Sequence, residues 1–134
     1  MDLSEFETSK FADVGSVMPV RHPKTGDTLK NEDGSDMTVT VYGTDGDVFQ
    51  KAQRAKINSK MKLRRTSGKM TAEEIQADTL DLLAAATADW NITLDGAKPE
   101  FTPANVRAVY TRLPWLRKQV DEWMADEANF SPAS

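Results

Sequence analysis

Side chains that commonly carry out catalysis are scarce in this sequence. The 134 residues include no cysteine, which excludes disulfides, thiolate catalysis and cysteine-based metal sites. The single histidine, His22, precedes a turn, and local spacing places no serine or carboxylate beside it. No phosphate-binding glycine loop and no G-x-S-x-G motif occurs. We predict no catalytic residue and expect a protein that is not an enzyme.

Acidic residues next to glycine raise the question of a metal site. DGSD at 33–36 and TDGD at 44–47 begin like calcium loops, but neither continues to the full ligand pattern with its distal glutamate. Neighbouring carboxylates such as Asp121 and Glu122 point in different directions on a helix. We interpret them as turns and a solvated face, and we predict no metal and no cofactor.

A basic segment occupies residues 48–70, with eight Lys or Arg residues and no acidic residue, whereas the rest of the chain has 9 basic and 21 acidic residues. It is open to three interpretations: a solvated helix face, a surface that docks on an acidic protein such as a second copy of this chain, or a nucleic-acid site. Phe49 is its only aromatic residue, so nucleic acid is the least favoured of the three. For a charged contact we predict Lys51, Arg54, Lys62, Arg64 and Arg65.

The elements that position these residues begin with β structure. Residues 1–12 are interpreted as a mobile arm, and the PKTGD turn at 23–27 predicts a β-hairpin. Alternation in MTVTVYG at 37–43 predicts a strand with Val39 and Val41 on one face. We predict that the edge of this strand binds a partner.

Helices follow in the second half of the chain. A helix is predicted from about 46 to 65, and Thr71 with Glu74 forms a capping box for the next one. The apolar spacing of that second helix predicts a core face that runs from Ile75 to Trp90. Thr102 and Pro103 start a third helix as cap and first residue.

Pro114 follows Leu113 and most simply starts the last helix, because proline disfavours helical geometry in its predecessor but fits a first turn. Trp115 lies one step round from the apolar stripe of this helix, and Phe130 follows the helix. Two interpretations are open for these aromatics: core packing, or anchors for a partner. We include both residues in the predicted partner-binding set.

Together these signals predict an α+β fold, with a small N-terminal antiparallel β-hairpin or sheet followed by a bundle of about four α-helices. Residues 13–130 form the single domain, between the arm at 1–12 and a disordered tail at 131–134. No apolar run approaches the roughly 20 residues that span a bilayer, and the acidic start lacks the features of a signal peptide. We expect a cytoplasmic protein.

Two blocks of the sequence resemble the tail assembly chaperones of long-tailed bacteriophages. MTVTVYGTDGDVFQKAQRAK resembles the family's strand, V-x-G-x-D turn and basic helix. WNITLDGAKPEFTPANVRAVYTRLPWLRKQVDEWMADEANF resembles its W, G, F-[ST]-x-x-N, P-W-[IL] and N-F pattern. Gly46 stands where the family usually has serine. The matching positions are Val41, Gly43, Asp45, Trp90, Gly96, Phe101, Asn105, Pro114, Trp115, Asn129 and Phe130.

The resemblance implies a role without catalysis in the host cell cytoplasm. Such chaperones bind the tape measure protein, keep its helices soluble, help recruit the tail tube protein and leave before the tail is complete. The resemblance also implies a frameshifted longer form of the chain as a partner, and we expect self-association into a homo-oligomer. The alternatives are a nucleic-acid-binding regulator that uses residues 51–69 and a minor structural protein of the virion.

Overall fold

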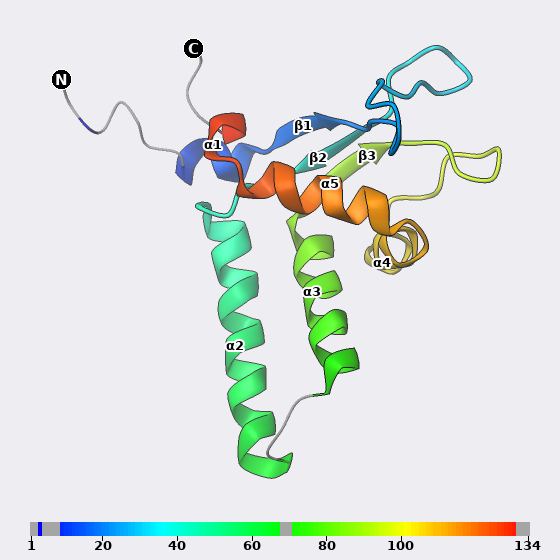
Figure 1. The fold of residues 1–134 in the computed structure, drawn as a ribbon. Coiled ribbons are helices and arrows are strands. Elements are labelled where there is room, and N and C mark those ends of the chain that lie inside the picture. Colours follow the sequence, from blue (N-terminus) through cyan, green and yellow to red (C-terminus); the bar gives the residue numbers. More distant parts are fainter. Residues whose placement is uncertain (1–2, 4–8, 68–70, 131–134) are drawn as a thin grey trace.

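The structure is a computed structural model that describes residue 3 and residues 9–67 and 71–130, with side chains at 3, 12–58, 71–126 and 128–130. A three-stranded antiparallel sheet and its covering helices confirm the α+β prediction (Figure 1). The elements are α1 (Ser9–Val14), β1 (Ser16–Pro19), β2 (Thr38–Val41), α2 (Asp47–Ser67), α3 (Ala72–Ala86), β3 (Thr87–Asn91), α4 (Pro103–Arg112), α5 (Pro114–Ala125) and the 3-10 helix η2 (Glu127–Phe130).

Residues 9–12 of the predicted N-terminal arm belong to a helix instead. Residues 9–14 form α1, and Ala12 is completely buried. The backbone N–H of Gly43 donates to the carbonyl of Ala12 at 3.0 Å, so α1 is fastened to the end of β2. The rest of the predicted arm, apart from residue 3, and the predicted tail at 131–134 lie outside the described residues.

The sheet has the order β1-β2-β3, so β2 is its central strand. Val39 pairs with Met18 on one side and with Trp90 on the other. Strand β3 is absent from the sequence prediction, which continues the preceding helix as far as Trp90. Thr87 ends that helix instead with extended backbone angles, and the residues after it pair with β2. Tertiary pairing overrides a helical spacing that Trp90 also satisfies.

The predicted helix starts are confirmed. Thr71 and Glu74 form the capping box of α3, and the Thr102 hydroxyl accepts a hydrogen bond from the N–H of Asn105 at 3.1 Å. Pro103 and Pro114 lie in the first turns of α4 and α5. The predicted helix at about 46 to 65 is α2, which extends with α3 away from the sheet as an antiparallel pair (Figure 1).

One carboxylate connects three helices at the base of this pair. Lys56 Nζ of α2 lies 2.6 Å from Asp81 Oδ2 of α3, and Arg107 Nε of α4 lies 3.8 Å from Asp81 Oδ1. The hydrogen bond to Asp81 raises the pKa of Lys56. Lys56 also lies 3.5 Å from Asp78. The ion pairs orient α3 against both α2 and α4.

Asp81→Asn should therefore lower the free energy of unfolding by about 1 kcal/mol at low salt, and by less in concentrated salt, since screening weakens ion pairs. Urea denaturation at two salt concentrations measures this. The matched control is Asp36→Asn at the Lys30–Asp36 pair, whose side chains are 63% and 54% exposed, respectively. That change should stay within about 0.5 kcal/mol. Equal losses in the two variants would contradict a linking role for Asp81.

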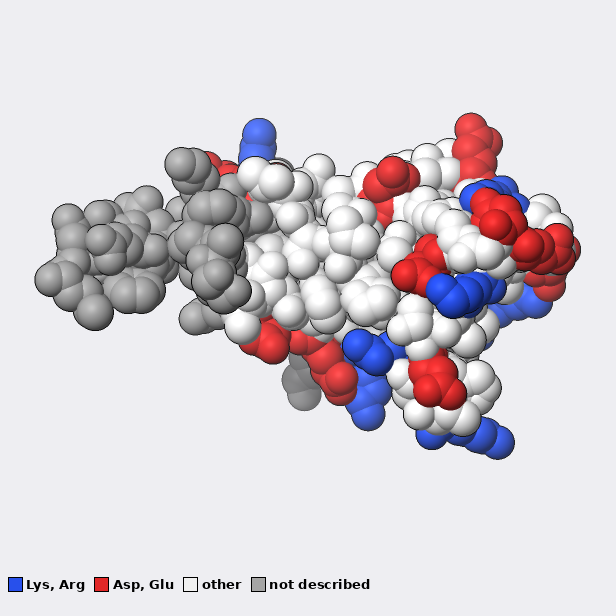
Figure 2. Space-filling view, turned by 90° about the horizontal axis from the view of Figure 1, so that it is seen from above, with Lys and Arg blue, Asp and Glu red and all other residues white. Residues whose placement is uncertain are grey.

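The core lies between the sheet and helices α3, α4 and α5, with α5 across one sheet face (Figure 1). Tyr110 of α4 is completely buried in this core, and Leu116, Val120 and Met124 line the inner face of α5. Long turns lie at the end of the sheet away from α1 (Figure 1), and this end carries charges of both signs (Figure 2). Lys98 pairs with Asp33 between two of these turns, and Arg112 of α4 pairs with Asp95.

Candidate partner-binding groove

The predicted binding edge at Val39 and Val41 is wrong. Both side chains are 0% exposed, and β2 has a paired strand on each side. Their alternation therefore marks the core face of a central strand. The strands at the edges of the sheet are β1 and β3.

Of the two interpretations of Phe130, the structure supports core packing, and the prediction that Phe130 binds a partner is wrong. Its side chain is 4% exposed, and the aromatic ring lies where a Cβ on Gly43 would come within 2.9 Å of its Cγ. The side-chain amide of Asn129 donates to the Trp123 carbonyl at 3.0 Å and holds the segment after α5. Phe130 thus closes the core over the end of β2, because only a glycine at 43 leaves room for the ring.

Trp115 is the predicted aromatic that lies at an open surface. It is partly buried against the core and borders a groove of about 500 Å³ between α3 and α5. Leu83, which is nearly fully buried, belongs to the lining, and Ile75 on α3 is half exposed. The lining residues are Ile75, Gln76, Thr79, Leu83, Pro114, Trp115, Arg117, Lys118 and Asp121.

The groove exists because the N-terminal half of α3 extends beyond the body of the molecule (Figure 1). Ile75 and Thr79, which the sequence predicts as core, are exposed there. The buried residues of α3 are Leu83 and Ala86, near its C-terminus. The helical period identifies which residues share a face, but the length of the neighbouring helix decides how much of that face is covered.

The other wall, α5, is held at several points along its length. The side-chain amide of Gln119 accepts from the backbone N–H of Arg21 at 3.0 Å and donates to its carbonyl at 2.8 Å. Trp123 Nε1 donates to the Ser16 hydroxyl at 3.1 Å. These contacts fix α5 against β1 and the turn that follows it, so Trp115 is presented by a rigid element.

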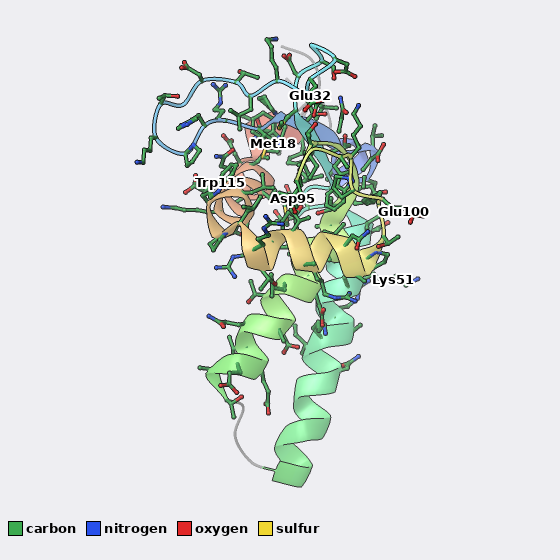
Figure 3. All side chains as sticks on the ribbon, turned by 90° about the vertical axis from the view of Figure 1, so that its right-hand side faces the viewer. Met18, Glu32, Lys51, Asp95, Glu100 and Trp115 are labelled. Atoms are coloured by element: carbon green, nitrogen blue, oxygen red, sulfur yellow. The ribbon has the colours of Figure 1, made fainter. Side chains whose placement is uncertain are left out.

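The predicted charged face lies elsewhere. Lys51 and Arg54 are exposed on α2. Lys56, which follows them on the same helix, forms ion pairs with Asp78 and Asp81. Figure 3 places Lys51 and Trp115 on opposite sides of the molecule. The other residues of the predicted charged contact lie outside the described side chains: Lys62, Arg64 and Arg65.

The titratable side chains of the described residues meet in ion pairs, as at Lys56, Asp78, Asp81 and Arg107. No group of three or more His, Asp or Glu suited to a metal occurs among them. His22 Nδ1 accepts hydrogen bonds from the N–H groups of Lys24 and Thr25 and stabilises the turn. Hydrogen bonds from Ser35 lower the pKa of Asp33 to about 2, again within a turn. No described helix is both long and apolar enough to cross a membrane.

Most positions that match the chaperone pattern have contacts inside the fold. The rings of Trp90 and Phe101 pack edge to face with centroids 5.4 Å apart, and Trp90 Nε1 donates to the carbonyl of Pro99 at 3.0 Å. The Asn105 side chain donates to the carbonyl of Glu100 at 2.9 Å. Trp115 differs, because it borders the groove. Comparison of the chain with protein-family models, curated proteins and solved structures finds no match.

Proposed function

We propose that this protein is a tail assembly chaperone of a long-tailed bacteriophage. It binds the tape measure protein, keeps the amphipathic helices of that client soluble and helps recruit tail tube subunits, and it leaves before the tail is complete. The observation that carries the proposal is the apolar groove at Trp115, which two helices border and no described segment fills. The two sequence blocks that resemble this family support the same function.

The groove suits a reversible interaction with a helical client. Helices are commonly bound when their apolar stripe lies in a groove and contributes anchors at i, i+3 or i+4, and i+7. Tryptophan is a favoured anchor at such interfaces because it buries a large area at a low cost in conformational entropy. In the proposed function, the internal contacts of Trp90, Phe101 and Phe130 build the scaffold, and Trp115 contacts the client.

The proposal includes the other members of the assembly reaction. The protein acts in the host cell cytoplasm, without cofactor or catalysis, as a homo-oligomer together with a longer frameshifted form of the same chain. The exposed Lys51 and Arg54 of α2 are available for contacts between copies. Lys51 lies on a different side of the molecule from Trp115, so self-association through this part of α2 leaves the groove accessible (Figure 3).

Co-expression with the tape measure protein tests the function. The wild-type chain should move the client from the insoluble to the soluble fraction and co-purify with it. Trp115→Ala and Ile75→Gln, which remove apolar lining from the groove, should each weaken co-purification by about tenfold or more. Val17→Ala is the control, because Val17 is 59% exposed outside the groove.

A client that is equally soluble with and without the chain would disprove the chaperone function. Thermal unfolding of each variant checks that a loss of binding does not come from a loss of fold. Mass spectrometry of purified virions provides a second check, since a chaperone should be absent from them. Retention of the protein in virions would instead identify a structural subunit.

A further inference from the structure

The α5 wall of the groove carries two basic residues whose charges are not neutralised by the described part of the chain. Arg117 and Lys118 follow Trp115 closely, and neither forms an ion pair with a described residue. Arg107 and Arg112 on the preceding helix each pair with a carboxylate. Positive charge is therefore concentrated beside the apolar lining.

The charge of this wall changes along α5. Arg117 and Lys118 lie towards its N-terminus, and Asp121 lies about one turn further on. A ligand with acidic groups near Arg117 and Lys118 is attracted, whereas the same groups beside Asp121 are repelled. The wall thus favours one charge pattern and one placement of the ligand.

The lining of the groove favours a helix over an extended strand. Both walls are helices, α3 and α5, and neither offers an open sheet edge for backbone pairing. Ile75, Leu83 and Trp115 provide apolar surface within a volume of about 500 Å³. These side chains suit the apolar stripe of an amphipathic helix.

We propose that the groove binds an amphipathic α-helix that carries acidic residues beside its apolar stripe. The acidic side chains face Arg117 and Lys118, and the apolar stripe contacts Trp115 and Ile75. The identification of this helix as part of the client rests on the proposed chaperone function. The recognition chemistry rests on the groove alone, so the two can be tested apart.

Two synthetic helical peptides of about 20 residues test the recognition chemistry. They share one stripe of leucines and differ in the flanking residues, which are Glu in one and Lys in the other. Fluorescence anisotropy with the full wild-type chain should show that the Glu peptide binds about tenfold more tightly or better, and that added salt reduces the preference. Equal affinities for the two peptides would overturn the proposal.

A charge reversal assigns the preference to this wall. The double variant Arg117→Glu, Lys118→Glu should reverse the order of the two peptides. Lys51→Glu with Arg54→Glu makes the same change of charge on α2, where Lys51 lies on the opposite side of the molecule from Trp115, and it should keep the wild-type order. A Glu preference that survives the first variant, or is lost equally in both, would contradict the proposal.

The client separates this inference from the proposed function. Should the Arg117→Glu, Lys118→Glu variant keep the tape measure protein as soluble as the wild type does, the identification of the acidic helix as part of the client fails and the chaperone function stands. Should the wild type bind the Glu peptide selectively and yet leave the client insoluble, the recognition chemistry stands and the chaperone function fails.

Discussion

Replacing Tyr110 by alanine should lower the free energy of unfolding by about 3–5 kcal/mol, the usual cost of removing a buried aromatic ring. Tyr110 is completely buried in α4, and its hydroxyl lies 2.6 Å from Thr87 Oγ1 at the junction of α3 and β3. Thr87 donates its only hydroxyl proton to the carbonyl of Leu83 at 2.8 Å. The Tyr110 hydroxyl is therefore the donor to Thr87, and both the ring and the hydrogen bond hold α4 against this junction.

Tyr110→Phe separates the hydroxyl from the ring. It should cost about 1 kcal/mol at neutral pH, the net value of one hydrogen bond. Burial raises the pKa of Tyr110 to about 12. Because its pKa is higher in the folded state, the protonated Tyr110 hydroxyl contributes its full stability below the unfolded pKa of about 10. This contribution is lost as the pH rises through 12. Urea denaturation of both variants and the wild type measures these terms.

Between about pH 9 and about pH 11 the wild type should lose roughly 1 kcal/mol more than Tyr110→Phe. Other alkaline titrations, such as those of lysines, occur in both proteins and cancel in the comparison. An identical pH dependence would contradict burial of the Tyr110 hydroxyl. A Tyr110→Ala variant as stable as Tyr110→Phe would contradict burial of the ring.

Gly43→Val should have the second large effect, a loss of about 3 kcal/mol or more, because added atoms in a packed core force the surroundings apart. A Cβ at position 43 would lie 2.8 Å from the Cβ of Ala12 and 2.9 Å from Phe130 Cγ. The two methyl groups of valine increase this overlap. Thermal unfolding measures the loss, which reports the closure of α1 and η2 over the end of β2.

Gly34→Ala is the control for this prediction. Gly34 has φ of +87° in a turn, and a Cβ there would meet no atom within 4 Å. Its substitution should cost about 1 kcal/mol through backbone strain alone. If Gly43→Val were no more costly than Gly34→Ala, α1 and Phe130 would not pack on Gly43 as described.

The features that sequence predicts well here are local. The capping box of Thr71 and Glu74 joins residues three positions apart, and the hydrogen bond between Thr102 and Asn105 has the same spacing. Pro114 restricts Leu113 through a direct steric contact. Such signals do not depend on the rest of the fold, so the starts of α3, α4 and α5 follow from the chain alone.

The features that sequence predicts poorly depend on distant partners. The alternation at Val39 and Val41 fits an edge strand and a central strand equally well. Only the pairing of β3 with β2 shows that the strand is central. Phe130 is buried because Gly43, far away in the chain, leaves space for its ring. Trp115 is the only lining residue of the groove that the sequence predicts as a binding residue. The α3 wall of the groove depends on how far α3 extends beyond α5, which local sequence signals do not give.

The most direct test of the chaperone function is the aggregation of the purified tape measure protein on dilution from denaturant, followed by light scattering. An equimolar amount of this chain should suppress most of the scattering, and Trp115→Ala should suppress much less of it at the same concentration. Scattering that is unchanged by a large molar excess of the folded wild-type chain would contradict the function proposed for this protein.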